Sequence, residues 1–203
     1  KGDFADSLVE MDSRVGQVLD TIDTCGLTEE TLFIFASDNG PEYRRPWRGS
    51  AGMSTGTYPT AMEGALRVPL IVRWPGKVPE QRTTNDIVHV VDLMPTLARA
   101  AGAELPRDRI IDGVDQLDFW TGRQPKSNRE GFVYYIKTEL RAAKWRDWKM
   151  HFSWEVEPND GEKHLETPYL FNLVQDPKEE CDVNAEQGWA RGPIRKMIFA
   201  FQS

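Results

Sequence analysis

The sequence has 203 residues, of which 39% are hydrophobic and 28% are charged, and its formal net charge is −7. A chain of this length and composition can bury the core of a globular domain. The acidic balance argues against nucleic acid as a partner, because phosphate binding requires a basic surface. No apolar run is long enough to cross a bilayer, which argues against a membrane-spanning protein.

Residues 4–22 have the pattern of an amphipathic helix. Their apolar side chains recur at intervals of three and four residues: Phe4, Leu8, Met11, Val15, Val18, Leu19 and Ile22. This stripe predicts a helix that lies on a sheet. A helix, a short turn and then a strand form half of a βαβ unit, so the sequence predicts an α/β fold. We expect the preceding strands to lie outside this sequence, in an earlier part of a longer protein.

Residues 31–36 form an apolar run that is typical of a strand buried on both faces of a parallel sheet. Asp38, Asn39 and Gly40 follow it closely, and open α/β sheets bind ligands beyond the carboxyl ends of their strands. A carboxylate beside an amide oxygen suits a hard cation such as Ca²⁺ or Mg²⁺. The alternative interpretation is that Asp-Asn-Gly is only a turn.

Residues 41–62 lack clear periodicity and are rich in Gly, Ser, Thr, Pro and Arg. A loop of this length without regular structure is uncommon in a compact domain unless it has a function. Guanidinium groups bind sulfate or phosphate oxygens in a bidentate way, so anionic ligands fit this loop. The alternative is a solvated loop with surface arginines. The residues that carry this argument are Arg44, Arg45, Trp47 and Arg48.

Three further elements are predicted before residue 124. Residues 70–74 form a second short strand, and residues 87–91 form either a strand or an extended lead. Asp92 is predicted to cap a helix over residues 93–101, in which Pro95 lies in the first turn, where it costs little.

From residue 124 onward the sequence changes character. Short aromatic and β-branched runs separated by charged turns predict an antiparallel sheet, and they lie at residues 132–136, 140–145, 148–154 and 169–174. Residues 194–201 predict a packing helix. We therefore predict an α/β body over residues 1–123 and a small antiparallel α+β subdomain over residues 124–203.

Five segments, taken in chain order, resemble those of one known family. They are residues 8–16; Ser37-Asp38-Asn39-Gly40-Pro41; Trp47-Arg48-Gly49 with Glu63-Gly64 and Arg67-Val68-Pro69; Trp74-Pro75-Gly76 with residues 91–97 and 112–115; and Trp148-Lys149 with residues 170–173 and 176–180. Together they resemble the sulfatases of the alkaline-phosphatase superfamily, in particular bacterial arylsulfatases. The resemblance implies an incomplete alkaline-phosphatase-like body, with a mixed or parallel sheet, followed by the small subdomain.

The resemblance implies a chemistry as well as a fold. Asp38 and Asn39 match two ligands of a divalent cation, usually Ca²⁺, that holds the sulfate oxygens. The attacking group in the family is a formylglycine made from Cys or Ser in a Cys/Ser-x-Pro-x-Arg motif, and a charged, crowded transition state of this kind needs a metal and fixed cations. Neither Cys25 nor Cys181 lies in such a motif, and no serine does. We therefore expect the nucleophile upstream of this sequence, and we expect the chain alone to be inactive.

One family feature is missing from the sequence. Many sulfatases place a sulfate-binding lysine shortly before the Glu-Gly segment, but residues 53–62 contain no lysine. We expect Arg48 or another loop cation to replace it, or a hydroxyl group to bind the substrate. The candidate hydroxyl groups are those of Thr57, Tyr58 and Thr60.

Other polar and aromatic residues are predicted to have structural roles. Glu63 is expected to bind the loop backbone or Arg67 rather than to act as an acid or base. The three histidines are expected to lie on the surface or to be satisfied in the core. The seven tryptophans are expected to pack rather than to form a carbohydrate platform, with Trp47 as the exception to be tested.

These features predict part of a sulfuric ester hydrolase that acts on small-molecule or carbohydrate sulfate esters, with a periplasmic or secreted location implied by the resemblance. One alternative is a phosphodiesterase or phosphonate hydrolase of the same superfamily. Another is a non-catalytic relic that binds sulfate or glycan. The upstream nucleophile motif would help to separate the enzymes, and the full reading frame would test the relic.

Overall fold

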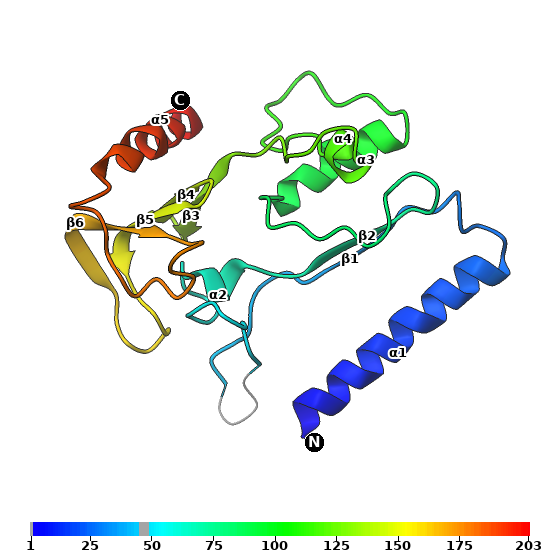
Figure 1. The fold of residues 1–203 in the computed structure, drawn as a ribbon, viewed down its shortest axis with the longest axis horizontal. Coiled ribbons are helices and arrows are strands. Elements are labelled where there is room, and N and C mark those ends of the chain that lie inside the picture. Colours follow the sequence, from blue (N-terminus) through cyan, green and yellow to red (C-terminus); the bar gives the residue numbers. More distant parts are fainter. Residues whose placement is uncertain (1, 45–48) are drawn as a thin grey trace. The chain divides into compact units, whose positions relative to one another are not determined.

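The fold is described from a computed structural model that covers residues 2–44 and 49–203 (Figure 1). The helices are α1 (Asp3–Thr24), α2 (Glu63–Leu66), α3 (Leu93–Ala100), α4 (Leu117–Trp120) and α5 (Arg191–Gln202), with 3₁₀ turns η1 (Val90–Asp92) and η2 (Gly188–Ala190). The strands are β1 (Phe33–Ala36), β2 (Leu70–Arg73), β3 (Gly131–Ile136), β4 (Glu139–Trp145), β5 (Trp148–Trp154) and β6 (Lys163–Asn172). Within this part of the chain, no helix is both long and apolar enough to span a membrane.

The chain divides into two compact units, and each is described by itself. The first contains the chain up to Thr21, Phe35–Leu70 and Gly131–Ser203, and the second contains Ile22–Ile34 and Ile71–Glu130. The first unit therefore combines segments from both sides of residue 124. The domain boundary between residues 123 and 124 stays a prediction.

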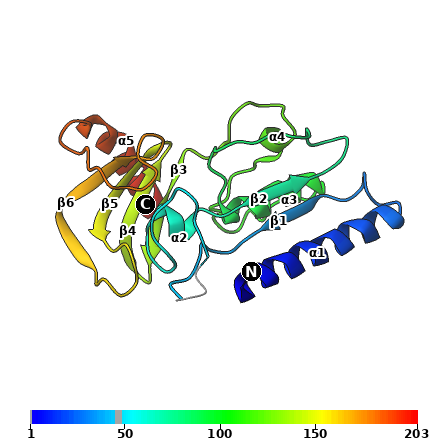
Figure 2. The same ribbon diagram turned by 60° about the horizontal axis from the view of Figure 1, so that its bottom comes forward.

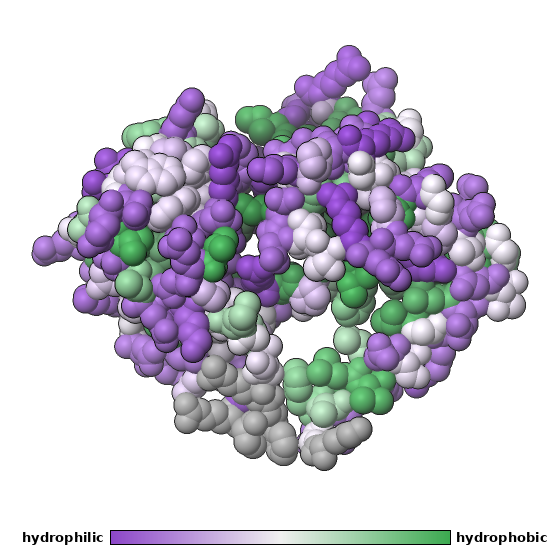
Figure 3. Space-filling view, in the orientation of Figure 1, coloured by the Kyte–Doolittle hydropathy of each residue, from purple (hydrophilic) through white to green (hydrophobic). Residues whose placement is uncertain are grey.

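Helix α1 confirms the predicted amino-terminal helix, but not the burial expected of it. No residue of α1 is buried. The apolar side chains at positions 4, 8, 11 and 18 are between 43% and 51% exposed, and Figure 3 shows apolar residues along the helix surface. The stripe residues Val15, Leu19 and Ile22 are half-buried, so the described residues cover the stripe only in part. The expectation that the stripe lies on a sheet stays a prediction.

Strands β1 and β2 confirm the two predicted strands of the body, and they pair with each other in a two-stranded sheet. The predicted burial of β1 on both faces is wrong. Its first three residues are only partly buried, and Ala36 is exposed. The reason is that, among the described residues, β1 is hydrogen-bonded to one strand only.

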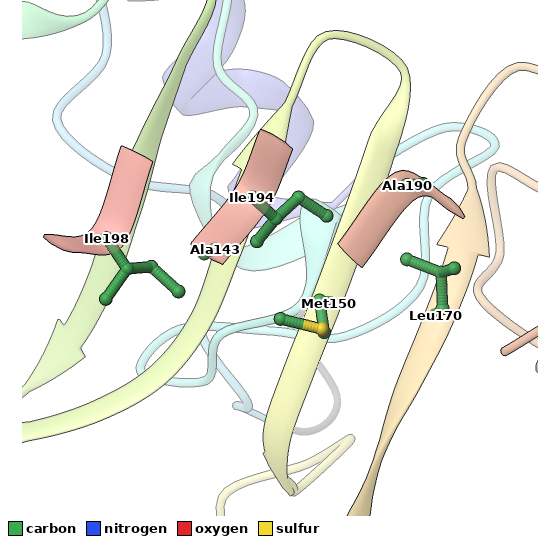
Figure 4. Packing of buried hydrophobic residues seen from close by; sticks show 6 residues of the cluster. All are labelled: Ala143, Met150, Leu170, Ala190, Ile194 and Ile198. Carbon is green, nitrogen blue, oxygen red and sulfur yellow. The ribbon is translucent and has the colours of Figure 1, made fainter. Parts of the chain in front are cut away.

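Strands β3 to β6 form the predicted antiparallel sheet, in the order β3-β4-β5-β6. Strand β6 begins six residues before the run predicted at 169–174, and it ends at Asn172. Both faces of the sheet are covered. Successive side chains of a strand point to opposite faces, so neighbouring residues belong to different clusters. Ala143 faces α5, whereas Ala142 packs with Ala61 and Tyr134 on the other face. Figure 2 shows α5 and α2 on opposite sides of this sheet. Figure 4 shows the cluster on the α5 face, which consists of Ala143, Met150, Leu170, Ala190, Ile194 and Ile198.

Asp92, in the second unit, does not have the helix-capping role that the sequence predicts. Its side chain does not cap α3. The buried carboxylate instead accepts hydrogen bonds from the backbone N–H groups of His89 and Val114, each at 2.9 Å, and pairs with the Arg129 guanidinium. Burial alone would raise the pKa of Asp92, but the hydrogen bonds and charge of Arg129 lower it. Asp92 therefore ties η1 to segments that lie far along the sequence.

Candidate functional site

The predicted metal-binding loop directly follows β1. Asp38 is exposed and Asn39 is half-buried. Asp38 Oδ1 accepts a hydrogen bond from the Asn39 backbone N–H at 2.9 Å, and Asn39 Nδ2 donates to the Gly40 carbonyl oxygen at 2.7 Å. Oδ1 is the side-chain atom of Asn39 that can bind a hard cation, and the hydrogen bond of Nδ2 to Gly40 fixes the orientation of the amide group.

Two glycines allow this loop to lie against α2. The Gly40 N–H donates to the Ala65 carbonyl oxygen at 2.7 Å. A Cβ atom at position 40 would lie only 2.0 Å from the Gly64 carbonyl oxygen, and one at position 64 would lie 2.6 Å from the carbonyl oxygens of Thr55 and Gly56. Any larger residue at either position would push the backbones apart. The glycine of Asp-Asn-Gly is thus required for close packing and not only for a turn.

The oxygen atoms of Asp38 and Asn39 fit part of a site for a hard cation. Ca²⁺ takes roughly six to eight oxygen ligands. The described residues contain no group of three or more His, Cys, Asp or Glu side chains that could hold a metal. These two side chains can therefore supply only a share of the coordination sphere.

The candidate substrate-binding residues differ in exposure. The Tyr58 side chain is accessible, with Tyr58 42% exposed, whereas Thr57 and Thr60 are buried. Thr57 Oγ1 donates to Glu157 Oε2 at 2.5 Å, and Thr60 Oγ1 donates to the Thr57 carbonyl oxygen at 2.9 Å. Both threonine hydroxyls are thus engaged inside the protein. The loop residues that lie outside the described part of the chain are Arg45, Trp47 and Arg48.

The backbone of Tyr58 is held beside the segment that follows the predicted metal-binding loop. Its N–H donates to the Pro41 carbonyl oxygen at 3.0 Å, and Glu42 and Tyr58 form an isolated parallel bridge. Pro41 is two residues after Asn39 in the sequence. Of the three candidate hydroxyl residues, Tyr58 is the one whose exposure and position suit contact with a ligand near Asn39.

A buried ionic network surrounds Glu63, the first residue of α2. Its carboxylate lies 2.8 Å from Lys144 Nζ and 3.2 Å from Lys149 Nζ, and it accepts a hydrogen bond from the Tyr134 hydroxyl at 3.0 Å. Glu179 Oε2 accepts from the Glu63 backbone N–H at 2.8 Å, and Glu179 Oε1 lies 3.0 Å from Lys149 Nζ. Glu63 therefore has a structural role, as predicted. Its partners include Lys144, Lys149 and Tyr134, which the sequence did not suggest.

Charge pairing controls the protonation of this network. Burial alone would raise the pKa of Glu63, but the ammonium groups of Lys149 and Lys144 lower it to about 2. The pKa of Glu179 is also lowered, because Lys149 and His151 outweigh its burial. Burial and Lys149 lower the pKa of His151, whose Nε2 lies 2.7 Å from Glu179. His151 is thus a core histidine whose Nε2 is paired with Glu179, but its buried Nδ1 has no hydrogen-bond partner among the described residues, so the expected satisfaction holds for one ring nitrogen only. The network balances two carboxylates with two ammonium groups.

This architecture is that of part of an alkaline-phosphatase-like α/β fold. The fold matches the crystal structure of the PsFucS1 sulfatase from Pseudoalteromonas sp. with a TM-score of 0.87 and 30% identity, over 97% of this chain and 41% of that chain. It also matches the phosphonate monoester hydrolase of Agrobacterium radiobacter with a TM-score of 0.62 and 22% identity, over 94% of this chain and 38% of that chain. The second likeness shows the fold alone.

Sequence comparisons identify the family. The Sulfatase family model matches residues 2–103, and the model for the C-terminal part of N-sulphoglucosamine sulphohydrolase matches residues 60–191. Steryl-sulfatase of Mus musculus is 35% identical over 213 residues, which cover 91% of this chain and 34% of the relative. Arylsulfatase A of Homo sapiens is 35% identical over 206 residues, with 90% and 39% covered. The chain belongs to the sulfatase family, as its motifs predict, and it spans between a third and two-fifths of the length of these relatives.

Proposed function

We propose that the chain is part of an enzyme that hydrolyses sulfate esters, with an aryl or carbohydrate alcohol as the leaving group. The observation that carries this proposal is the pair of oxygen donors, Asp38 and Asn39, held at the end of β1 by the close contact of Gly40 with α2. Membership of the sulfatase family supports the reaction class.

Asp38 and Asn39 would hold Ca²⁺ or Mg²⁺ together with ligands from outside the described residues. A bound divalent cation would polarise the sulfate oxygens and neutralise charge that develops during transfer of the sulfuryl group. The negative charge of Asp38 attracts the cation, and the Asn39 amide adds a neutral oxygen ligand. The formylglycine nucleophile is expected in a segment outside this sequence.

Tyr58 is proposed to contact the substrate, since its side chain is exposed and its backbone lies beside Pro41. Thr57 and Thr60 are proposed to contribute to the substrate loop mainly by fixing its shape, because their hydroxyls already donate to protein acceptors. Arg48 is proposed as the cation that replaces the missing lysine. This proposal for Arg48 rests on its sequence position alone.

The alternatives from the sequence are not favoured. Both matching family models describe sulfatases, whereas the likeness to a phosphonate hydrolase is one of fold. A catalytically inactive relic would show neither cation-dependent turnover nor a formylglycine. Both properties can be measured directly in the full-length protein.

The test compares full-length protein with Asp38→Ala and Asn39→Ala variants. We expect hydrolysis of 4-nitrophenyl sulfate that EDTA abolishes and Ca²⁺ restores, together with a formylglycine detected by mass spectrometry. Asp12→Ala, at an exposed position of α1, is the control and should keep the activity of the wild type. Faster turnover of 4-nitrophenyl phosphate or phenylphosphonate than of the sulfate ester would contradict the proposal.

A further inference from the structure

Four charged side chains are buried together on one face of the β3–β6 sheet. The side chains of Lys149 and Glu179 are fully buried, and those of Glu63 and Lys144 are 4% and 13% exposed. Buried charges are costly unless each has a partner of opposite sign. Lys144 and Lys149 are direct cross-strand partners in β4 and β5, an arrangement that is unfavourable for like charges. The Glu63 carboxylate contacts both ammonium groups and offsets their repulsion.

This network holds the first residue of α2 through both its side chain and its backbone. The side chain of Glu63 is bound by Lys144 and Lys149, and its N–H is bound by Glu179. Glu179 has a φ of +59°, in the left-handed region that non-glycine residues rarely adopt. Such a conformation persists only where surrounding contacts enforce it. The position of α2 is thus set by β4, β5 and the turn after β6.

The next two residues of α2 form the surface against which the metal-binding loop lies. The Ala65 carbonyl oxygen accepts the Gly40 N–H, and the Gly64 carbonyl oxygen lies where a Cβ of Gly40 would be. Asn39 immediately precedes Gly40. A shift of Glu63 would therefore move Gly64 and Ala65, and with them the backbone that carries Asn39.

Stability alone gives no reason for an ionic network at this position. Replacing buried ion pairs by apolar residues of similar volume is often neutral or stabilising. The opposite face of the same sheet is covered by apolar side chains, including Met150, Leu170 and Ile194. What the network supplies in addition is directional hydrogen bonding, since Lys144 and the Tyr134 hydroxyl donate to the Glu63 carboxylate and the Glu63 N–H donates to Glu179.

We propose that Glu63, Lys144, Lys149 and Glu179 are positioning residues that set the place of Asp38 and Asn39 through α2. The inference rests on the metal-binding role proposed above for those two residues. It assigns the C-terminal sheet a part in metal affinity, although the network residues do not themselves contact the cation.

The test measures Ca²⁺ affinity by calorimetry in the full-length protein, for wild type, Glu63→Gln and Lys149→Met. Both variants keep the side-chain volume close to that of the wild type. We expect each to raise the Kd for Ca²⁺ by about tenfold or more, as is found when residues that orient metal ligands are changed. We also expect faster hydrogen exchange of the Gly40 amide in the metal-free variants, because its hydrogen bond to Ala65 is weakened.

The matched control is Ile194→Ala, which removes packing from the opposite face of the sheet. It should lower the melting temperature and leave both the Kd for Ca²⁺ and the Gly40 exchange rate unchanged. Lys144→Met is a milder variant that keeps the test usable if Lys149→Met fails to fold, because Lys144 is at the exposed rim of the network.

Three outcomes would overturn the inference, and they are distinguishable. Tight Ca²⁺ binding with an unchanged Kd in the network variants would refute the positioning role and leave the proposed function intact. Failure of the wild-type protein to bind Ca²⁺ or Mg²⁺ would refute both. An equal loss of affinity in Ile194→Ala would show that general destabilisation, not positioning, is the cause.

Discussion

The two faces of the β3–β6 sheet are covered in chemically different ways. On the α5 face, Met150 and Ile194 belong to an apolar cluster, whereas on the α2 face Lys149 contacts Glu63. Lys149 and Met150 are neighbours on β5 and point to opposite faces. Apolar contacts tolerate small shifts and substitutions, while ion pairs require particular positions. The comparison suggests that the α5 face stabilises the unit and that the α2 face specifies where one helix lies.

The largest effect is expected from Lys149→Ala, which removes one of the two buried ammonium groups on the α2 face of the β3–β6 sheet. It leaves Glu63 with one ammonium partner fewer and Glu179 without its lysine, so the free energy of unfolding should fall by about 3–5 kcal/mol. Calorimetric melting of the full-length protein measures the change. Ile194→Ala on the apolar face should cost about 2–5 kcal/mol through the cavity it leaves. A negligible effect of Lys149→Ala would mean that the network is not formed as described.

Low pH should weaken the ion pairs on the α2 face of the sheet and leave the apolar contacts on the α5 face unchanged. The pKa of Glu63 is lowered from 4.5 to about 2, so its charge stabilises the fold fully above about pH 4.5. This contribution, roughly 3 kcal/mol by linkage, is lost as the pH falls from 4.5 toward 2. Melting temperatures measured across this range should fall less steeply in Glu63→Gln than in the wild type, whereas Ile194→Ala should keep the wild-type slope.

Asp38→Ala tests the proposed metal-binding loop, which packs against α2, the helix that begins at Glu63. Loss of a ligand should lower kcat/KM for a sulfate ester by at least about 100-fold, as is found when a group that stabilises transition-state charge is removed. Glu63→Ala acts only through position and should cost about tenfold. Steady-state kinetics at one and the same subsaturating Ca²⁺ concentration compares the two. Equal or reversed losses would count against Asp38 as a metal ligand.

The smallest effect is expected from Tyr58→Phe. If the exposed Tyr58 hydroxyl contacts the substrate as proposed, its removal should raise KM by about three- to tenfold with little change in stability. Tyr135→Phe is the matched control, because Tyr135 is 39% exposed and its hydroxyl accepts from Gln202 of α5. If both variants keep the wild-type KM, Tyr58 does not contact the substrate.

Local sequence patterns were sufficient to predict most of the elements. Three- and four-residue spacing identifies α1, and short aromatic and β-branched runs identify β3, β4, β5 and the last part of β6, because each pattern lies within a single element. The place of Asp38 and Asn39 after β1 is also local, since a strand followed by polar residues is contiguous in the chain. The ordered family motifs identify the sulfatase family for the same reason.

The tertiary structure alone decided which distant residues meet. Lys144 lies 81 positions after Glu63, and it contacts Glu63 only because the register of β4 and β5 brings both lysines to the face that α2 covers. Asp92 resembles a helix cap in sequence, yet its carboxylate binds Arg129, 37 positions away. Thr57 looks available to a substrate but donates to Glu157 in the β5–β6 hairpin. Register and packing depend on the whole chain at once, so no local pattern contains them.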